Sequence, residues 1–196
     1  MRAQVTDRPW SDFGIPIVPV PDLPIFRLPA IEGMPECDRP IFSALMAHFR
    51  PHRYLEFGTG PGMSLDIVKH FVPMGKAWSV DISPPTTYRP AGLKPVEGVN
   101  YILHDSHSWL PPADMLYSMD AVFVDAGHYL AGVAADTQKA LLLCKPDGIV
   151  VWHDVSLNDS SQEIWLYLNW YLYRMPIKWP EGSTIAWVDM REVKRG

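Results

Sequence analysis

The sequence predicts an α/β fold in which helices flank a mostly parallel sheet, and three observations support this. Short apolar runs alternate with segments of helical periodicity from residue 40 onward, as in βαβ units. A glycine-rich turn joins the first run to the first helical segment after it, and several later runs end in an acid. With 196 residues, 47% of them apolar, we expect one domain over residues 38–196.

A proline-rich arm, residues 1–37, precedes that domain. Residues 1–40 contain 8 of the 20 prolines, which excludes helix interiors and central strands and favours extended chain. The other residues of the arm are largely apolar, so it is expected to lie against the body. Two interpretations remain open, a structural strap or oligomer contact and a flap over the substrate site. Asp38 is then predicted to be the N-cap of a helix that ends before Pro51.

Residues 54–64 are predicted to form a strand, a glycine turn and the start of a helix. Gly58, Gly60 and Gly62 alternate in this turn, where glycine permits backbone conformations and close ligand approach that other residues forbid. A dinucleotide fingerprint is broken because its third glycine would fall on Met63, and no Lys followed by Ser or Thr completes a phosphate loop. The turn is predicted to hold a nucleotide-type ligand; the alternative is a tight turn without a ligand.

The next strand, residues 77–82, ends in an acid 19 residues beyond the last glycine of the turn. At that position Asp81 can accept hydrogen bonds from both hydroxyls of a ribose, with Ile82 beside the base. Residues 83–98 contain four prolines, so a loop is expected in place of the crossover helix before the third strand, residues 99–103.

A second set of polar residues follows the fourth and fifth strands. Residues 119–124 form a buried run that ends at Asp125, and His128 begins a helix over residues 129–144. Residues 149–152 then lead into His153 and Asp154. Parallel strands bring these ends to the edge where open α/β sheets bind ligands. Further on, residues 164–172 predict an aromatic helix and a homodimer contact, and residues 177–179 and 184–188 predict an antiparallel hairpin.

The glycine turn and its preceding Glu56 resemble the first motif of class I S-adenosylmethionine-dependent methyltransferases, and the resemblance spans roughly residues 40–190. Asp125-Ala-Gly-His128 followed by His153-Asp154 is similar to the cephalosporin-hydroxylase-type and macrolide-sugar O-methyltransferases. The resemblance implies a Rossmann-like, seven-stranded, mostly parallel sheet with reduced helices and an antiparallel C-terminal hairpin. It also implies S-adenosylmethionine as cofactor, with these contacts: Glu56, Gly58, Thr59, Gly60, Gly62, Asp81, Ile82, Asp105, Ser106 and Asp125. For Asp105 and Ser106 the alternative is a solvated loop.

Asp125, His153 and Asp154 look like the metal site of the catechol-type enzymes, which implies a divalent metal. The catechol pattern has a carboxylate where this chain has His153, and an imidazole shifts the preference from Mg toward Mn, Fe or Zn. Asp125 and His128 are the predicted catalytic residues, with His128 accepting the proton of a hydroxyl. Alternatively, His128 only closes the turn with Asp125, and His153 is hydrogen-bonded under the sheet edge.

Composition limits the partners. A net charge of −5 and a pI near 5.7 argue against nucleic acid, so the predicted substrate is a small metabolite with a hydroxyl group. No apolar run approaches 18 residues, and with only two cysteines we expect a protein of the reducing cytoplasm, away from membranes. Two rivals remain open: another enzyme that uses S-adenosylmethionine without metal (a lyase, hydrolase or N-methyltransferase), and a non-catalytic cofactor-binding module.

Overall fold

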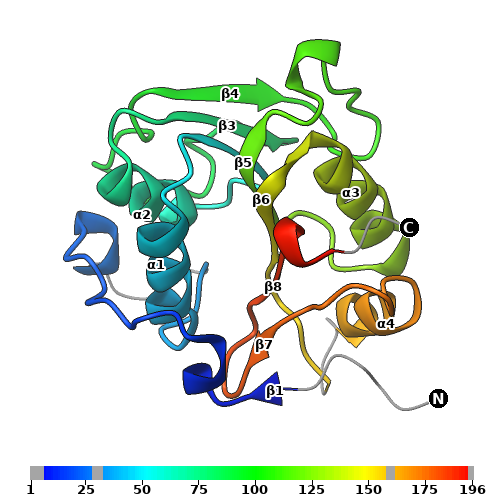
Figure 1. Cartoon of the computed structure of the whole chain (residues 1–196). Helices are drawn as coiled ribbons and strands as arrows, with labels where there is room; N and C mark the ends of the chain where they lie inside the picture. The colour runs from blue at the N-terminus through cyan, green and yellow to red at the C-terminus, as the bar shows by residue number, and fades with distance from the viewer. Residues whose placement is uncertain (1–6, 28–32, 158–161, 194–196) are drawn as a thin grey trace.

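A six-stranded sheet forms the centre of the computed structural model, which describes residues 7–27, 33–157 and 162–193 (Figure 1). The strand order is β4-β3-β2-β5-β6-β8. Five strands run parallel: β2 (Arg53–Phe57), β3 (Lys76–Asp81), β4 (Val99–Leu103), β5 (Met119–Val124) and β6 (Cys144–Trp152). Only β8 (Ala186–Asp189) is antiparallel, against β6. The predicted α/β class is confirmed, and the strand order reverses between β2 and β5, where such sheets form a ligand crevice.

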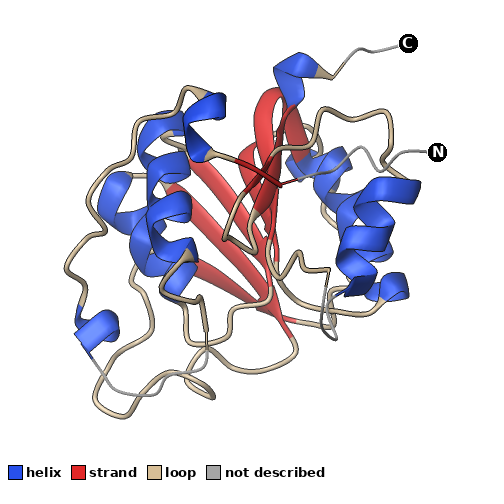
Figure 2. Ribbon diagram, turned by 90° about the horizontal axis from the view of Figure 1, so that it is seen from below, coloured by secondary structure: helices blue, strands red, loops and turns tan. Residues whose placement is uncertain are grey.

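Helices cover both faces of this sheet (Figures 1 and 2). On one face lie α1 (Asp38–Phe49) and α2 (Met63–Phe71), and on the other α3 (Leu130–Leu143) and α4 (Gln162–Trp170). Short 3-10 helices span Trp10–Phe13, Pro24–Arg27, Ala113–Met115 and Met190–Glu192. No helix among the described residues is long and apolar enough to cross a membrane.

The central strands are buried on both faces, as parallel strands between two helix layers are. Leu55 and Phe57 point to the α3/α4 side, whereas Tyr54 points to the α1/α2 side. The same alternation continues in β5 and β6, so two cores of comparable extent hold the sheet from its two sides. Cys144, the first residue of β6, is a buried free thiol.

The described part of the arm packs against the body. Trp10 and Phe13 place their rings 5.5 and 4.8 Å from that of Trp187, and Ile15 and Ile25 are buried in the core on the α1/α2 side. A two-stranded ladder pairs β1 (Asp7–Arg8) with β7 (Trp179–Pro180). Residues 7–27 therefore form the strap of the first interpretation.

Asp38 is not the helix N-cap that its sequence context predicts. The helix begins at Asp38 itself after Cys37, and no side chain caps it. The Asp38 carboxylate is fully buried instead and accepts hydrogen bonds from Ser183 and Thr184. Those donors lie about 145 residues away in sequence, so local spacing could not reveal them.

The loop of residues 83–98 agrees with its prediction, and the C-terminal hairpin agrees in part. Residues 83–98, all of them described, contain no helix or strand, as the prolines predict. Residues 184–188 overlap β8, and the other half of the predicted hairpin pairs with β8 only through one antiparallel bridge, between Lys178 and Trp187. The described sheet therefore has six strands. The spacing of the aromatic helix makes Ser160 or Ser161 its expected N-cap, and both lie outside the described residues. The homodimer contact stays a prediction, with Trp170 and Tyr171 exposed on and just after α4.

Candidate functional site

A cavity of about 680 Å³ opens at the carboxyl ends of the parallel strands. Its volume is in the range of small-molecule and cofactor sites. Most residues predicted from the sequence to bind cofactor or metal line it. They are Gly58, Thr59, Gly60, Asp81, Ile82, Asp105, Ser106, Asp125, His128, His153 and Asp154.

The glycine turn forms one end of the cavity. Gly58 has φ +88°, and a Cβ there would overlap the carbonyl oxygen of Asp125, so only glycine fits between β2 and β5. The Asp81 carboxylate accepts hydrogen bonds from the backbone N–H groups of Thr59, at 2.7 Å, and Gly60, at 3.4 Å. Asp81 therefore lies against the turn, where a ribose is expected. Gly62, the residue before α2, is not among the described lining residues.

Glu56 lies beneath the turn and not in the cavity lining. Its carboxyl group is fully buried and receives hydroxyl hydrogen bonds from Tyr54 (2.9 Å), Ser64 (2.6 Å) and Ser79 (2.9 Å). Burial raises the pKa of Glu56 to about 8; the three hydroxyls oppose this change, and the negative charge of Asp125 adds to it. Direct cofactor contact by Glu56 therefore does not fit this geometry, and its role here is to support the turn.

The β3 and β4 ends form a second wall. Ile82, Asp105 and Ser106 line the cavity, and Ile82 is 72% exposed. The Ser106 hydroxyl donates a hydrogen bond of 3.0 Å to the buried Asp136. His107 and Tyr129, which no sequence pattern marks as functional, also line the cavity, and the Tyr129 hydroxyl lies 2.9 Å from His107 Nδ1.

The loop of residues 83–98 contributes Tyr88 to the lining, and the next residue anchors it. Arg89 pairs with Asp66 of α2 at 2.9 Å and donates to the carbonyl oxygen of Pro61 at 2.8 Å. Both partners are close to the glycine turn, so the loop that replaces the crossover helix is fixed to the turn.

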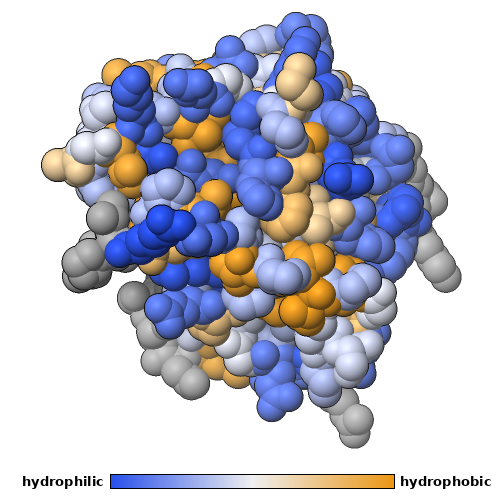
Figure 3. All heavy atoms as spheres, turned by 90° about the vertical axis from the view of Figure 1, so that its left-hand side faces the viewer, coloured by the Kyte–Doolittle hydropathy of each residue, from blue (hydrophilic) through white to orange (hydrophobic). Residues whose placement is uncertain are grey.

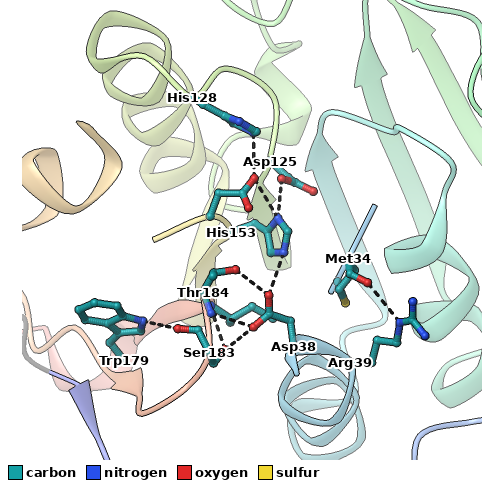
Figure 4. Close-up of polar contacts among 11 residues, drawn as sticks. Met34, Asp38, Arg39, Asp125, His128, His153, Trp179, Ser183 and Thr184 are labelled. Atoms are coloured by element: carbon teal, nitrogen blue, oxygen red, sulfur yellow. Dashed lines mark hydrogen bonds and ion pairs between the residues drawn. The ribbon is translucent and has the colours of Figure 1, made fainter. Parts of the chain in front are cut away.

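The opposite end holds an acid–imidazole cluster, which we define as Asp38, Asp125, His128, His153 and Asp154 (Figure 4). His153 Nδ1 lies 3.0 Å from Asp125 Oδ1 and 3.3 Å from Asp154 Oδ2. His153 Nε2 lies 3.3 Å from Asp38 Oδ2, as an ion pair that is not aligned as a hydrogen bond. Asp154 Oδ2 also lies 3.0 Å from Nε2 of His128, the most exposed member.

Opposite charges stabilise one another within this cluster. Burial alone would lower the pKa of His153, but its carboxylate partners, with Asp125 the strongest, hold the pKa well above its ordinary value. Burial likewise opposes ionisation of Asp38 and Asp154. The contact with His153 outweighs it, together with the hydroxyl groups of Ser183 and Thr184 at Asp38 and the charge of His128 at Asp154, so the pKa of each carboxyl lies below its ordinary value. At neutral pH His153 is an imidazolium between carboxylates.

Three of these side chains can approach one metal ion. Ligand atoms of Asp125, His128 and Asp154 all lie within 4.8 Å of one another. In six-coordinate sites with bonds of about 2.1 Å, neighbouring donors lie about 3 Å apart, close to the observed spacing of Asp154 Oδ2 and His128 Nε2. His153 was predicted as a ligand, but both its ring nitrogens face carboxylates. Asp154 has φ +55°, a strained conformation typical of functional sites.

Further residues of the site carried no functional signal in the sequence. Gly33 and Met34 come from the arm and line the cavity, so this part of the arm reaches the site as the second interpretation of the arm required. Asp38 reaches the cluster from α1. A polar residue before a helix suggests a cap, and nothing local indicates a partner more than 100 residues away.

Comparisons with known proteins agree with this geometry. A family model described as a methyltransferase domain matches residues 55–155, from β2 to just beyond Asp154. No curated protein sequence matches the chain.

Solved structures share the fold at low sequence identity. The O-methyltransferase TomG from Streptomyces achromogenes, in complex with SAM, is 19% identical, with 84% of each chain covered and a TM-score of 0.59. A putative caffeoyl-CoA O-methyltransferase from Staphylococcus aureus is 12% identical, with 84% and 87% covered and a TM-score of 0.60. The MycE methyltransferase of the mycinamycin pathway, in complex with Mg and SAH, is 18% identical, with 81% of this chain and 50% of MycE covered and a TM-score of 0.57. The family match spans more than half of the sequence, and the mostly parallel sheet has the strand order expected of a class I methyltransferase. This chain therefore belongs to the class I methyltransferase-domain family.

Proposed function

We propose that this protein is an S-adenosylmethionine-dependent O-methyltransferase that acts on a hydroxyl group of a small molecule, assisted by a divalent metal. One observation carries the proposal. A single cavity connects the glycine turn and Asp81 with the cluster of Asp125, His128 and Asp154. A cofactor seat and a group of acids and imidazoles that can bind and deprotonate an acceptor therefore share one space.

At the cofactor end, the turn would bind the cofactor through close backbone approach, and Asp81 would accept hydrogen bonds from the ribose. When bound, S-adenosylmethionine supplies a methyl group on a positively charged sulfur. The carboxylates of Asp105 and Asp125 on neighbouring strand ends suit polar and positively charged parts of such a ligand. TomG and MycE, whose structures hold SAM and SAH, support this assignment.

At the acceptor end, the residues would orient a hydroxyl and remove its proton. As the new O–C bond forms, the S–C bond breaks, sulfur keeps the electron pair, and the hydroxyl proton moves to His128. Histidine suits this role because it exchanges protons near neutral pH. Nε2 of His128 faces Asp154, which leaves Nδ1 for the acceptor proton. Alignment of the two substrates is the other contribution, worth about 7–11 kcal/mol in well-oriented reactions.

Asp125 and Asp154 would hold the metal, and His153 would orient the two carboxylates from behind. His128 lies within reach of the same ion but would stay unligated as the base, because an imidazole whose Nε2 binds a metal carries its proton on Nδ1 and cannot accept another. A divalent ion bound there would lower the pKa of the acceptor hydroxyl. Two carboxylates are ligands that both Mg²⁺ and Mn²⁺ accept. Mg in MycE supports a metal in this fold.

The charge of the cavity narrows the acceptor class. Its described lining includes four aspartates, Asp81, Asp105, Asp125 and Asp154, and no Lys or Arg. Phosphates and carboxylates are bound mainly by cationic groups, so we propose an uncharged acceptor and disfavour a coenzyme A ester.

Calorimetry with S-adenosylhomocysteine is the first test, and binding in preference to NAD and ATP is expected. Methyl transfer from S-adenosylmethionine is then measured on a panel of neutral polyols and phenols with matched phosphorylated compounds, with and without chelator and Mn²⁺. Activity that chelator removes and Mn²⁺ restores supports the proposal. Activity that chelator does not change favours an enzyme without metal, and tight binding without turnover on any acceptor favours a non-catalytic module.

A further inference from the structure

We propose that Asp38 is a positioning residue: its carboxylate fixes the ring of His153, and through that ring the cavity-facing carboxylates of Asp125 and Asp154. The inference rests on the proposed function for one point, that Asp125 and Asp154 bind the metal. Asp38 is not among the described residues that line the cavity, so it acts through His153.

Asp38 is itself held rigidly. Ser183 Oγ and the backbone N–H of Thr184 donate to its Oδ1 at 2.6 and 2.8 Å, and Thr184 Oγ1 donates to its Oδ2 at 2.6 Å. The donors are held in turn, because the carbonyl oxygen of Ser183 accepts a 2.7 Å hydrogen bond from Trp179 Nε1 (Figure 4). A fully buried carboxylate with three donors has one orientation available to it.

This orientation fixes the His153 ring. In the observed position both ring nitrogens face carboxylates, Nδ1 toward Asp125 and Asp154 and Nε2 toward Asp38. A ring flip would turn C–H groups toward the same carboxylates and lose both charge contacts. Without Asp38, only one side of the ring has an anionic partner, and its orientation is no longer determined from both sides.

The same segment also holds the backbone beside Asp154. The N–H of Val155 donates to the carbonyl oxygen of Thr184 at 2.8 Å. Asp38, Thr184, Val155, Asp154 and His153 thus form a closed ring of contacts. The strained backbone at Asp154 requires such support from its surroundings. Carboxylates behind a histidine commonly orient catalytic and metal-binding groups in this manner.

Two variants separate positioning from simple stabilisation. Asp38→Asn keeps the size of the side chain and removes the charge that faces His153. Ser183→Ala is the matched control: it removes one buried hydrogen bond to Oδ1, whereas the Thr184 N–H still holds Oδ1, Thr184 Oγ1 still holds Oδ2, and the charge that faces His153 remains. Three measurements are made on the full chain: S-adenosylhomocysteine affinity by calorimetry, Mn²⁺ affinity by electron paramagnetic resonance, and the ring ¹⁵N and ¹H signals of His153 by NMR.

We expect Asp38→Asn to weaken Mn²⁺ binding by about 10- to 100-fold and to shift the ring signals of His153. Ser183→Ala should leave both close to wild type, and neither variant should change S-adenosylhomocysteine affinity. The proposal is overturned if the two variants give the same Mn²⁺ affinity and the same ring signals. If the wild type binds no Mn²⁺, the metal part of the proposed function fails, and the ring signals alone decide the role of Asp38.

The wild-type protein provides an answer if Asp38→Asn does not fold. The Nε2 proton of His153 should exchange slowly with solvent, because Asp38 covers it in the buried interior. Exchange as fast as that of the exposed His128 ring would overturn the proposal.

Discussion

Replacing Glu56 by Gln should change how the stability of the protein depends on pH. Burial raises the pKa of Glu56 from its ordinary value of 4.5 to about 8 in the folded state. Between these two values the unfolded chain has released the proton while the folded protein still holds it. The free energy of unfolding of the wild type must therefore fall as pH rises through this interval, and it is flat with respect to Glu56 below 4.5 and above 8. Glutamine has a similar shape and cannot ionise.

The expected size follows from the interval. Each pH unit between the two pKa values changes the free energy of unfolding by about 1.4 kcal/mol. From pH 5 to pH 8 the stability of the Gln variant relative to wild type should rise by about 4 kcal/mol. Solvent screening does not reduce this value much, because the carboxyl group is fully buried.

Urea unfolding at several pH values from 5 to 8.5 measures the effect. All other titrating groups are common to the two proteins, so the difference in unfolding free energy isolates Glu56. Tyr54→Phe is the control, because it removes one donor to Glu56 and keeps the carboxyl group. It should lower stability and retain the decline with pH. A difference between the Gln variant and wild type that stays constant across this range would refute a buried, protonated Glu56.

Three further outcomes are expected. Asp81→Asn should weaken S-adenosylhomocysteine binding by about 1–3 kcal/mol, measured by calorimetry, and unchanged affinity would remove Asp81 from the cofactor site. Gly58→Ala should destabilise the fold by about 2–4 kcal/mol in urea unfolding, because the added Cβ would overlap the carbonyl oxygen of Asp125. Gly60→Ala has open space around its Cβ and only backbone strain, so it should lose about 1–2 kcal/mol. Equal losses in the two variants would contradict this steric account. His128→Ala should slow methyl transfer by about 10²- to 10⁴-fold with S-adenosylhomocysteine affinity unchanged, whereas a wild-type rate would exclude it as the base.

The sequence predicted those parts of the site that depend on local spacing. A strand, a glycine turn and an acid at the next strand end are each defined within about 30 residues, and the parallel sheet brings such ends together without further information. For this reason Asp81, Asp125 and His128 were identified before their geometry was known. Strand periodicity also places Tyr54 and Glu56 on one face, and their hydrogen bond in the core shows that this face is not the cavity.

Contacts between distant elements could not be predicted in this way. Asp38 stands at the start of an amphipathic helix, where a cap is the simplest expectation from sequence, and its partners Ser183 and Thr184 lie in a polar turn far along the chain. Met34 reaches the cavity from an arm whose composition indicated extended chain and left open whether the arm covers the site. In each case the position depends on how α1 and the arm pack against the far end of the chain, which single-sequence periodicity does not encode.

The site is therefore assembled from three regions of the chain with different roles. The family match covers residues 55–155, which supply the glycine turn, Asp81 and all described lining residues of the cavity except Gly33 and Met34. Asp38 comes before this region and Thr184 after it, and together they fix His153 behind the cavity-facing carboxylates. The methyltransferase core can thus supply the reacting groups, while the segments that flank it determine how rigidly those groups are held. Under the proposed function, variation at Asp38 and Thr184 would change metal affinity through His153, because neither residue lines the cavity.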